Sequence, residues 1–411
     1  MINIRIGEFS KKHAVTQNTV RHYLDMGLLT TRKTGGQYVF YDKDNKDMEE
    51  ILKLKGLGFN LNEILNLLTY LRLIGIETEE YKNMIFSMLK KKIEEIEEIS
   101  KKYENMRSDI DETIKSYEKK SREINILGLP VTYLGIIKCP DCKSKLNIKN
   151  GIIDNSMLIE GKVICKCGYH AIIKNGIFIE EKTVRKRLLN GNPWPTQDDY
   201  LKVVSSNFIN FMYSGMNKIS DELRKYDKDS KLVLELQHCV GYFLKHHLNH
   251  RSKDSTYILV DYDLDKILDL KNSLELNQEH SNFIFLCCDI DRMPLGESSI
   301  DIIVDHWLTK DYAQTDNDFV LEKVLPLLKK EGILVGSYPY FKTMKNIKNI
   351  PKHALDCFNK DKLLEMIEGL GLNTENISEI GPVIEDNPYN FDISGKEVYQ
   401  MIYLGERQNI G

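Results

Sequence analysis

The chain has 411 residues, of which 42% are hydrophobic and 29% charged. This composition is typical of globular proteins and excludes a disordered chain, and the length corresponds to roughly two to four domains. The net charge of −4 excludes a positive field over the whole molecule. No uncharged apolar run is long enough to span a membrane, and the first residues lack the apolar region of a signal peptide. We therefore expect a cytoplasmic protein with reduced cysteines.

Residues 6–29 predict two short helices joined by a tight turn. Thr16 stands where a helix N-cap is needed, because its hydroxyl can accept a backbone N–H of the first turn. Gly27 stands where the second helix ends, because glycine enters the left-handed region without penalty. The outward-facing side chains between them that can donate to phosphates and base edges are Gln17, Asn18, Arg21 and His22.

The next residues predict a β-wing and a further helix. Arg32 and Lys33 precede GGQYVFY at residues 35–41, and helical spacing resumes at residues 48–73. The pieces IGEFSKKHAV, RHY before MGLL, the wing and KGLGFNLNEI follow one another in an order and spacing that resemble the MerR family of bacterial transcription regulators. The family usually has a basic residue after the wing tyrosine Tyr38, whereas this chain has Val39, which removes one expected phosphate contact.

The resemblance implies a winged helix-turn-helix DNA-binding domain over residues 1–75. The first 34 residues carry six Lys and Arg residues against two carboxylates, which gives this segment a local positive field. The alternative is a small helical domain whose surface happens to be basic. Arg21, His22 and Gln17 are expected in the DNA groove, and Arg32 and Lys33 on phosphates. The full set of expected DNA contacts is Thr16, Gln17, Asn18, Thr19, Arg21, His22, Tyr23, Arg32, Lys33, Tyr38 and Tyr41.

A seven-residue apolar repeat predicts a long helix between residues 85 and 124. One position is filled by Leu89, Ile96, Tyr103, Ile110, Tyr117 and Ile124. The interleaved position holds Ile85, Ile99 and Met106, interrupted by Lys92, Thr113 and Lys120. This pattern is typical of a coiled coil, although a single helix packed on its own domain is the alternative. The MerR resemblance implies that the helix, over residues 76–127, pairs antiparallel with its copy in a homodimer.

Four closely spaced cysteines predict a zinc ribbon over residues 128–182. Cys139 and Cys142 form a C-x-x-C knuckle, and Cys165 and Cys167 form a shorter C-x-C pair. Thiolates are good zinc ligands, and two knuckles can bring four of them to one tetrahedral point. Because the second pair is one residue short, His170 is an alternative ligand for one of its cysteines. We expect structural zinc, with a redox dithiol, ordinary buried cysteines and a metal-sensing role as alternatives.

Residues 183–411 predict an α/β domain. Apolar strands at residues 231–236, 256–263 and 282–290 alternate with amphipathic helices, which implies a parallel sheet covered on both faces. This half resembles the class I S-adenosylmethionine (SAM) methyltransferases, and the resemblance implies a Rossmann-like fold. The residues that it implies for cofactor binding are Glu235, Gln237, Gly241, Asp261 and Asp289. Asp261 corresponds to the acidic residue that holds the ribose, and Asp289 to the one that reads the adenine.

The first loop of this domain departs from the family pattern. The family has ExGxGxG, whereas this chain reads ELQHCVG, so that Gln237 and Cys239 replace two glycines and only Gly241 remains. Side chains at these positions are expected to narrow the methionine end of the cleft. Asp305 or His306, after the fourth strand, could act as a general base, although strand ends often carry polar residues without a catalytic role. We therefore assign no catalytic residue.

The predicted fold class is a multidomain α and α/β protein with a winged helix-turn-helix, a coiled-coil helix, a zinc ribbon and a methyltransferase-like domain. The predicted function is a dimeric regulator of promoter DNA whose last domain senses a small-molecule effector. The MerR resemblance implies that it distorts the promoter so that RNA polymerase can engage it. Two alternatives stay open: an active SAM-dependent methyltransferase with a DNA-binding head, and a last domain that only binds a protein partner.

Overall fold

The computed structural model describes residues 4–74, 78–118, 126–181, 197–236, 241–277, 282–344, 350–385 and 395–408. Contacts divide the chain into two units, Met1–Lys120 and Ser121–Gly411. Within the described residues, no helix combines the length and apolar character needed to cross a membrane.

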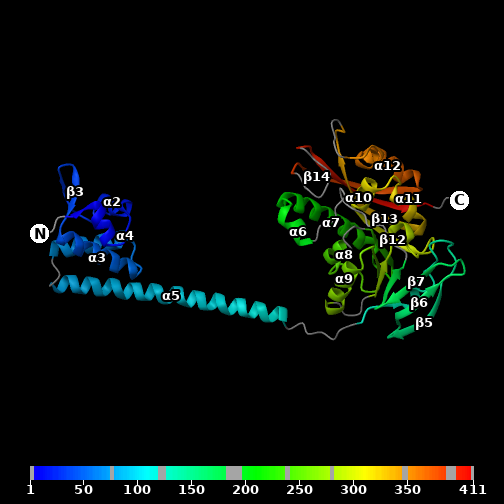
Figure 1. Cartoon of the computed structure of the whole chain (residues 1–411), viewed down its shortest axis with the longest axis horizontal. Coiled ribbons are helices and arrows are strands. Elements are labelled where there is room, and N and C mark those ends of the chain that lie inside the picture. Colours follow the sequence, from blue (N-terminus) through cyan, green and yellow to red (C-terminus); the bar gives the residue numbers. More distant parts are fainter. Residues whose placement is uncertain are drawn as a thin grey trace. The chain divides into compact units, whose positions relative to one another are not determined.

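The first unit is a small helical domain followed by one long helix (Figure 1). Its three short strands form a sheet in the order β1-β3-β2. Phe9 and Phe40 are fully buried, and their rings stack with centroids 4.0 Å apart, which joins the first helix to the wing. Its elements are β1 (Ile4–Arg5), α1 (Ile6–Lys12), α2 (Gln17–Asp25), β2 (Lys33–Thr34), β3 (Gln37–Phe40), α3 (Asp42–Gly56), α4 (Leu61–Ile74) and α5 (Glu79–Glu118). The predicted winged helix-turn-helix is confirmed.

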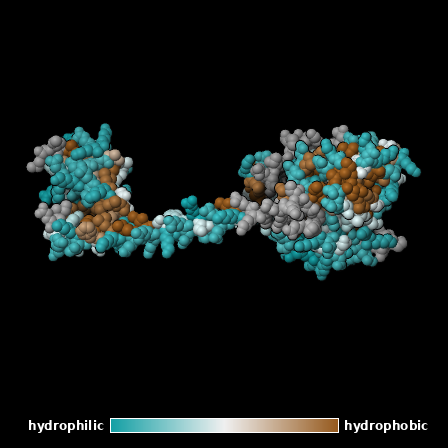
Figure 2. Space-filling model, turned by 90° about the horizontal axis from the view of Figure 1, so that it is seen from below, coloured by the Kyte–Doolittle hydropathy of each residue, from teal (hydrophilic) through white to brown (hydrophobic). Residues whose placement is uncertain are grey.

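Helix α5 is 40 residues long, which confirms the predicted long helix for the described part of residues 85–124. Its first turns pack on the unit's own core through Ile85 and Leu89. Lys92 lies 3.2 Å from Glu63 on α4 and holds the two helices together. Beyond that point the predicted apolar positions face solvent, and Figure 2 shows apolar residues along the first half of α5. Ile124 and Lys120 of the repeat lie outside the described residues.

The second unit is built on one sheet of twelve strands (Figure 1). The strand order is β14-β15-β13-β12-β9-β10-β11-β8-β7-β6-β4, with β5 paired to β6. Its strands are β4 (Leu129–Pro130), β5 (Asn147–Asp154), β6 (Met157–Ile164), β7 (His170–Lys174), β8 (Ile177–Glu180), β9 (Leu232–Leu236), β10 (Thr256–Asp261), β11 (Asn282–Cys287), β12 (Ile300–His306), β13 (Leu328–Phe341), β14 (Leu372–Val383) and β15 (Val398–Arg407). The predicted Rossmann-like sheet is confirmed.

The central strands are parallel and buried on both faces. β9 lies between β10 and β12, so the order in which successive strands are added to the sheet reverses at β9. Open α/β sheets bind ligands at the carboxyl ends of the strands beside such a reversal. Val233 of β9 packs with α8 and α9, and its neighbour Leu234 with α10 to α12. The helices are η1 (Val131–Tyr133), α6 (Gln197–Val203), α7 (Ser206–Tyr226), α8 (Tyr242–His247), α9 (Leu264–Asn277), η2 (Ile290–Arg292), α10 (Leu308–Thr315), α11 (Val320–Val324), η3 (Leu325–Leu327), η4 (Lys352–Phe358) and α12 (Lys360–Gly369).

The cysteine-bearing ribbon is continuous with this sheet. β5, β6, β7 and β8 pair antiparallel, as predicted for a ribbon. β8 then pairs parallel with β11, with Ile177 opposite Phe285. The ribbon therefore covers the β11 edge of the central sheet, which would otherwise expose unpaired backbone groups.

Candidate functional sites

Helix α2 presents a polar face to solvent. Its N-cap is Thr16, whose Oγ1 accepts the Thr19 N–H at 3.1 Å, and Gly27, just beyond its end, has φ of 78°. These observations confirm the predicted cap and stop. Gln17, Asn18, Arg21 and His22 are exposed, and Thr19 is half-buried. The Arg21 guanidinium donates to Asn18 Oδ1 at 3.3 Å, which orients it along the exposed face.

Tyr23, predicted above as a DNA contact, lies on the opposite side of α2. Its side chain is 1% exposed and packs in the core with Val20. Its hydroxyl lies 3.5 Å from Lys55 Nζ on α3. The ring of Tyr23 therefore anchors α2 to the domain, and a DNA contact through its hydroxyl stays a prediction.

The wing adds cations beside α2. Arg32 and Lys33 are exposed. Lys33 pairs with Tyr38 across β2 and β3, and its ammonium lies 4.8 Å from the ring centroid. Tyr38 and Tyr41 are half-buried, and the Tyr41 N–H donates to Asp44 Oδ2 at 2.7 Å where α3 begins. Val39, the departure from the family pattern, pairs with Arg5 of β1.

Arg72, which the sequence did not indicate as important, stabilises the end of α2. From α4 it donates to the Gly27 carbonyl at 3.1 Å and the Leu28 carbonyl at 2.5 Å, and it lies 2.7 Å from Asp47 Oδ2. These bonds satisfy carbonyls that follow α2 and hold the end of this helix. No local pattern could reveal the contact, because 45 residues separate Arg72 from Gly27.

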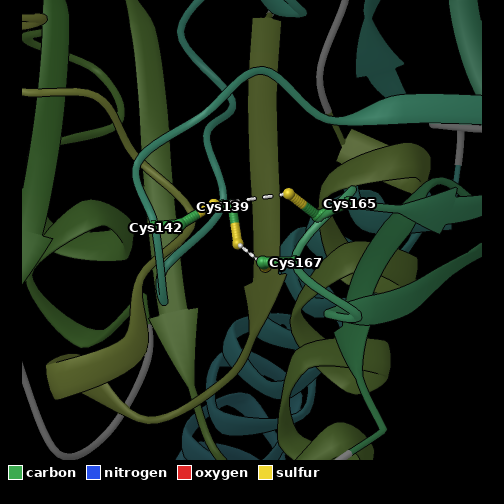
Figure 3. A group of neighbouring side chains, drawn as sticks. All are labelled: Cys139, Cys142, Cys165 and Cys167. Carbon is green, nitrogen blue, oxygen red and sulfur yellow. Dashed lines mark hydrogen bonds between the residues drawn. The ribbon is translucent and has the colours of Figure 1, made fainter.

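The four predicted metal ligands lie together (Figure 3). The thiol sulfurs of Cys139, Cys142, Cys165 and Cys167 all lie within 4.8 Å of one another. Cys139 and Cys167 are 3.5 Å apart, and Cys142 and Cys165 are 3.4 Å apart. Tetrahedral zinc with Zn–S bonds of about 2.3 Å holds its sulfurs roughly 3.8 Å apart. The cluster therefore fits a structural zinc site with four thiolate ligands.

His170, the alternative ligand, is not part of this group. Its Nε2 lies 3.3 Å from a Glu181 carboxylate oxygen, and its Nδ1 lies 3.4 Å from the Gly168 carbonyl oxygen. The four thiols differ in their surroundings. Hydrogen bonding with Ser144 lowers the pKa of Cys142 to about 6, whereas burial raises that of Cys139 to about 12. A divalent cation at their centre would stabilise all four thiolates.

An arginine ties the first cysteine knuckle to the central sheet. Arg292, at the end of η2, lies 2.9 Å from Asp141 between the first two cysteines. Its Nε also lies 2.7 Å from Glu180 of β8, a side chain that is only 1% exposed. Because η2 begins directly after Asp289, the arginine that pairs with the knuckle lies on the same short segment as the predicted adenine-reading residue.

The predicted cofactor residues lie at the carboxyl ends of three neighbouring strands. Glu235 of β9, Asp261 of β10 and Asp289 after β11 are all buried. Asp261 accepts the Asp263 N–H at 2.9 Å, and Asp289 caps η2 through the Asp291 N–H at 3.3 Å. Glu235 accepts the Leu244 N–H at 3.1 Å, and burial raises its pKa to about 8.

Glu235 leaves one polar atom for a further partner. Its Oε1 is buried and has no hydrogen-bond partner among the described residues. Gly241, directly before α8, has φ of 73°, and a Cβ there would lie 2.4 Å from the Leu270 side chain. Glycine is therefore required for packing as well as for backbone conformation. Gln237 and Cys239 lie outside the described residues.

The indole of Trp307 is buried directly after the end of β12. Trp307 is 5% exposed, and its Nε1 donates to Ser337 Oγ at 3.1 Å and Gln400 Oε1 at 3.0 Å. Phe208 of α7 packs edge-on against it with centroids 5.8 Å apart. Asp305 and His306 are buried as well, and burial raises the pKa of Asp305 to about 7 and lowers that of His306 to about 3.

Two family models match the chain in these regions. A model described as MerR HTH family regulatory protein matches residues 4–71, and one described as methyltransferase domain matches residues 241–405. The chain joins a MerR-type helix-turn-helix domain to a methyltransferase domain. The predicted resemblances to the MerR family and to methyltransferases are thus confirmed, and the MerR-type domain supports a DNA-binding regulator.

Solved structures of both kinds resemble parts of the chain. A MerR family transcriptional regulator from Bacillus cereus is 24% identical, and the match covers 30% of this chain and 87% of that one, with a TM-score of 0.24. A SAM dependent methyltransferase from Aquifex aeolicus is 13% identical over 51% and 98% of the two chains, with a TM-score of 0.35. An N1-methyltransferase from Burkholderia thailandensis, solved with bound S-adenosylhomocysteine, is 15% identical over 53% and 92%, with a TM-score of 0.32. No curated protein matches the chain.

Proposed function

We propose that this protein is a homodimeric transcription regulator that reads promoter DNA with α2 and senses a small molecule through its methyltransferase domain. The observation that carries the proposal is the row of exposed polar side chains on α2 of a MerR-type domain. Arg21, His22 and Gln17 are the proposed groove contacts, because they can donate to or accept from base edges. Arg32 and Lys33 are the proposed phosphate contacts of the wing.

Dimerisation is proposed to occur through α5. Ile96, Ile99, Tyr103 and Ile110 are all more than half exposed in the single chain, although they are large and apolar. Pairing with a second copy would remove this surface from water, which stabilises association. The dimer would present two copies of α2 to half-sites about one helical turn of DNA apart. We also propose, from the resemblance to the MerR family, that the dimer distorts the promoter so that RNA polymerase can engage it.

Selection of duplexes from a random-sequence pool by the wild-type chain tests the DNA-binding proposal. The expected product is a pseudo-palindromic site with two half-sites, because a two-fold symmetric dimer reads each strand once. Recovery of no enriched sequence, or of a single unpaired half-site, would contradict the proposal. The selected duplex then serves as the probe for variants.

The methyltransferase domain is proposed to act as a sensor that can hold SAM. Asp261 would hold the ribose of SAM and Asp289 its adenine. Glu235 would support the loop that follows β9. When bound, SAM supplies an electrophilic methyl group. The buried Trp307 and its two hydrogen bonds occupy the end of β12, which favours sensing over transfer to a large acceptor.

Calorimetric titration of the purified protein with SAM and with S-adenosylhomocysteine tests the sensor proposal. Binding of either compound, lost in Asp261→Asn, supports it. Exposed Asp229→Asn, just before β9, is the matched control. If neither compound binds, SAM is excluded as the effector. Methyl transfer from bound SAM to an acceptor would instead favour the enzyme alternative.

A further inference from the structure

The loop that carries Asp289 is bound to the chain that leads into the first cysteine knuckle. We call residues 289–296 the adenine-side segment, because the proposed adenine contact Asp289 begins it. Its Leu295 forms an antiparallel bridge with Ile137, and both side chains are buried. Two backbone hydrogen bonds flank the bridge, from the Lys138 N–H to the Pro294 carbonyl at 2.9 Å and from the Gly296 N–H to the Ile136 carbonyl at 2.8 Å. Cys139, a proposed zinc ligand, directly follows this paired stretch.

Arg292 adds a side-chain contact between the adenine-side segment and the knuckle. Its guanidinium lies 2.9 Å from the carboxylate of Asp141, which stands between the first two cysteines, and 2.7 Å from that of Glu180. Its backbone N–H donates to the Asp289 carbonyl at 2.9 Å. Charge-assisted hydrogen bonds are roughly twice as strong as neutral ones. Arg292 therefore joins the knuckle to the backbone of Asp289 through one side chain.

Other contacts hold the adenine-side segment to the methyltransferase domain. Asp291 accepts the Tyr312 hydroxyl at 2.6 Å and lies 3.3 Å from the Lys323 ammonium. The Cys288 N–H, directly before the segment, donates to the Asp261 carbonyl at 3.0 Å. These partners lie on α10, α11 and β10, which carry no proposed zinc ligand. The knuckle differs from them, because zinc ligation fixes its backbone. A metal would therefore act on the segment through its contacts with the knuckle.

We propose that Arg292 is a positioning residue through which the occupied zinc site holds the adenine-side segment in the conformation that binds SAM. This inference rests on the sensor function proposed above. Zinc ligation would fix the position of Asp141, and Asp141 would fix Arg292 and the backbone of Asp289. A site that is formed only part of the time binds its ligand more weakly by that fraction. Linkage is reciprocal, so bound SAM should raise the affinity for zinc by the factor that zinc raises the affinity for SAM.

Hydrogen exchange followed by mass spectrometry tests the positioning role without any ligand. Zinc-loaded, full-length Arg292→Gln and Asp141→Asn should each retain one zinc, because neither residue supplies a thiolate. Peptides that cover residues 289–296 should exchange at least about fivefold faster in both variants than in wild type, since local opening becomes easier. Lys329→Gln removes an ion pair with Asp301 of 2.8 Å and is the matched control that should leave this segment unchanged. Unchanged exchange in both zinc-loaded variants would overturn the positioning role.

Equilibrium competition for zinc against a colorimetric chelator, with and without SAM, tests the link to the ligand. Saturating SAM should raise the zinc affinity of wild-type protein at least about fivefold. This factor should fall toward one in Arg292→Gln and stay at the wild-type value in Lys329→Gln. A purely structural ion pair would leave zinc affinity independent of SAM. Equal zinc affinity with and without SAM, in a wild-type protein that binds SAM by calorimetry, would therefore overturn the link. If wild type does not bind SAM, the sensor function fails, and hydrogen exchange alone decides the positioning role.

Discussion

Polar site residues are exposed in the first unit and buried in the second. Gln17, Arg21 and His22 project from α2 into solvent, whereas Glu235 and Asp261 at the ends of β9 and β10 are 3% and 5% exposed. An exposed row can meet a rigid partner as large as a DNA duplex without rearrangement. Buried carboxylates can meet only a small ligand that enters between the strands and helices. The two units are therefore suited to partners of very different size.

The two units also differ in what stabilises them, because only the second contains the proposed zinc site. Of the changes considered, zinc removal should lower the stability of that unit the most. All eight cysteines lie in the second unit, so chelation should act there alone. Zinc contributes on the order of 10 kcal/mol to the folding of small zinc domains. Its loss should unfold the ribbon, expose the β11 edge and lower the melting temperature of the second unit.

Differential scanning calorimetry with and without EDTA measures this effect, with metal content determined by mass spectrometry. Cys165→Ser should reproduce the loss of zinc, and Cys357→Ala, a buried cysteine outside the cluster, should retain one zinc per chain. A wild-type protein that folds without zinc and ignores EDTA would contradict the assignment.

A charge in the apolar repeat of α5 should have the next largest effect. Ile110→Glu places a carboxylate where two copies are proposed to pair, and like charges then face each other in an apolar contact. Because two linked half-site contacts bind about 100-fold or more tightly than one, affinity for the selected duplex should fall by at least that factor.

Sedimentation of Ile110→Glu should show a monomer. Ser108→Glu adds the same charge to α5 two residues away, outside the repeat, and should remain dimeric with unchanged DNA affinity. A dimeric Ile110→Glu would show that α5 does not provide the interface.

The buried carboxylates should make the stability of the second unit depend on pH. Burial raises the pKa of Glu235 to about 8 and that of Asp305 to about 7, so both are favoured in the neutral form. Their contribution is complete below about pH 4 and is lost as the pH rises toward 8. Each group lowers the free energy of unfolding by roughly 1.4 kcal/mol per pH unit within its window.

Urea unfolding between pH 5 and 8 measures this slope. Glu235→Gln should flatten it, most clearly as the pH approaches 8, where Asp305, with a pKa of about 7, is mostly ionised in the folded protein. The exposed Glu375→Gln is the control and should keep the wild-type slope. An unchanged slope in Glu235→Gln would show that this carboxyl is ionised in the folded protein.

The same contrast explains how much could be predicted from the sequence. The limits of α2 were predicted correctly from Thr16 and Gly27, because caps and stops depend on neighbouring residues. The four-cysteine group could be predicted from the spacing of the cysteines alone. Only the structure shows that His170 lies outside this group and does not replace one of its cysteines. The parallel sheet covered by helices was predicted from alternating strands and helices together with family resemblance, whereas the spatial order of its strands comes from the structure.

Long-range contacts could not be predicted. Arg72 reaches the end of α2 from α4, and the pairing of β8 with β11 joins the ribbon to the central sheet. Trp307 fills the end of β12 through partners on β13 and β15. The burial of the Tyr23 ring could not be predicted either, because the family motif does not show which side of the helix packs on the core. Each of these features depends on residues brought together only by the fold.

The affinity of wild-type and Arg21→Ala protein for the selected duplex, compared by fluorescence anisotropy at physiological salt, tests the central claim most directly. A lost base-edge contact costs about 1–3 kcal/mol, so the affinity of Arg21→Ala should fall roughly 5- to 150-fold. Dimer mass and zinc content should stay unchanged. Lys101→Ala, which removes an exposed cation of α5, should bind like wild type. Equal affinity of Arg21→Ala and wild type would contradict the assignment of α2 as the recognition helix.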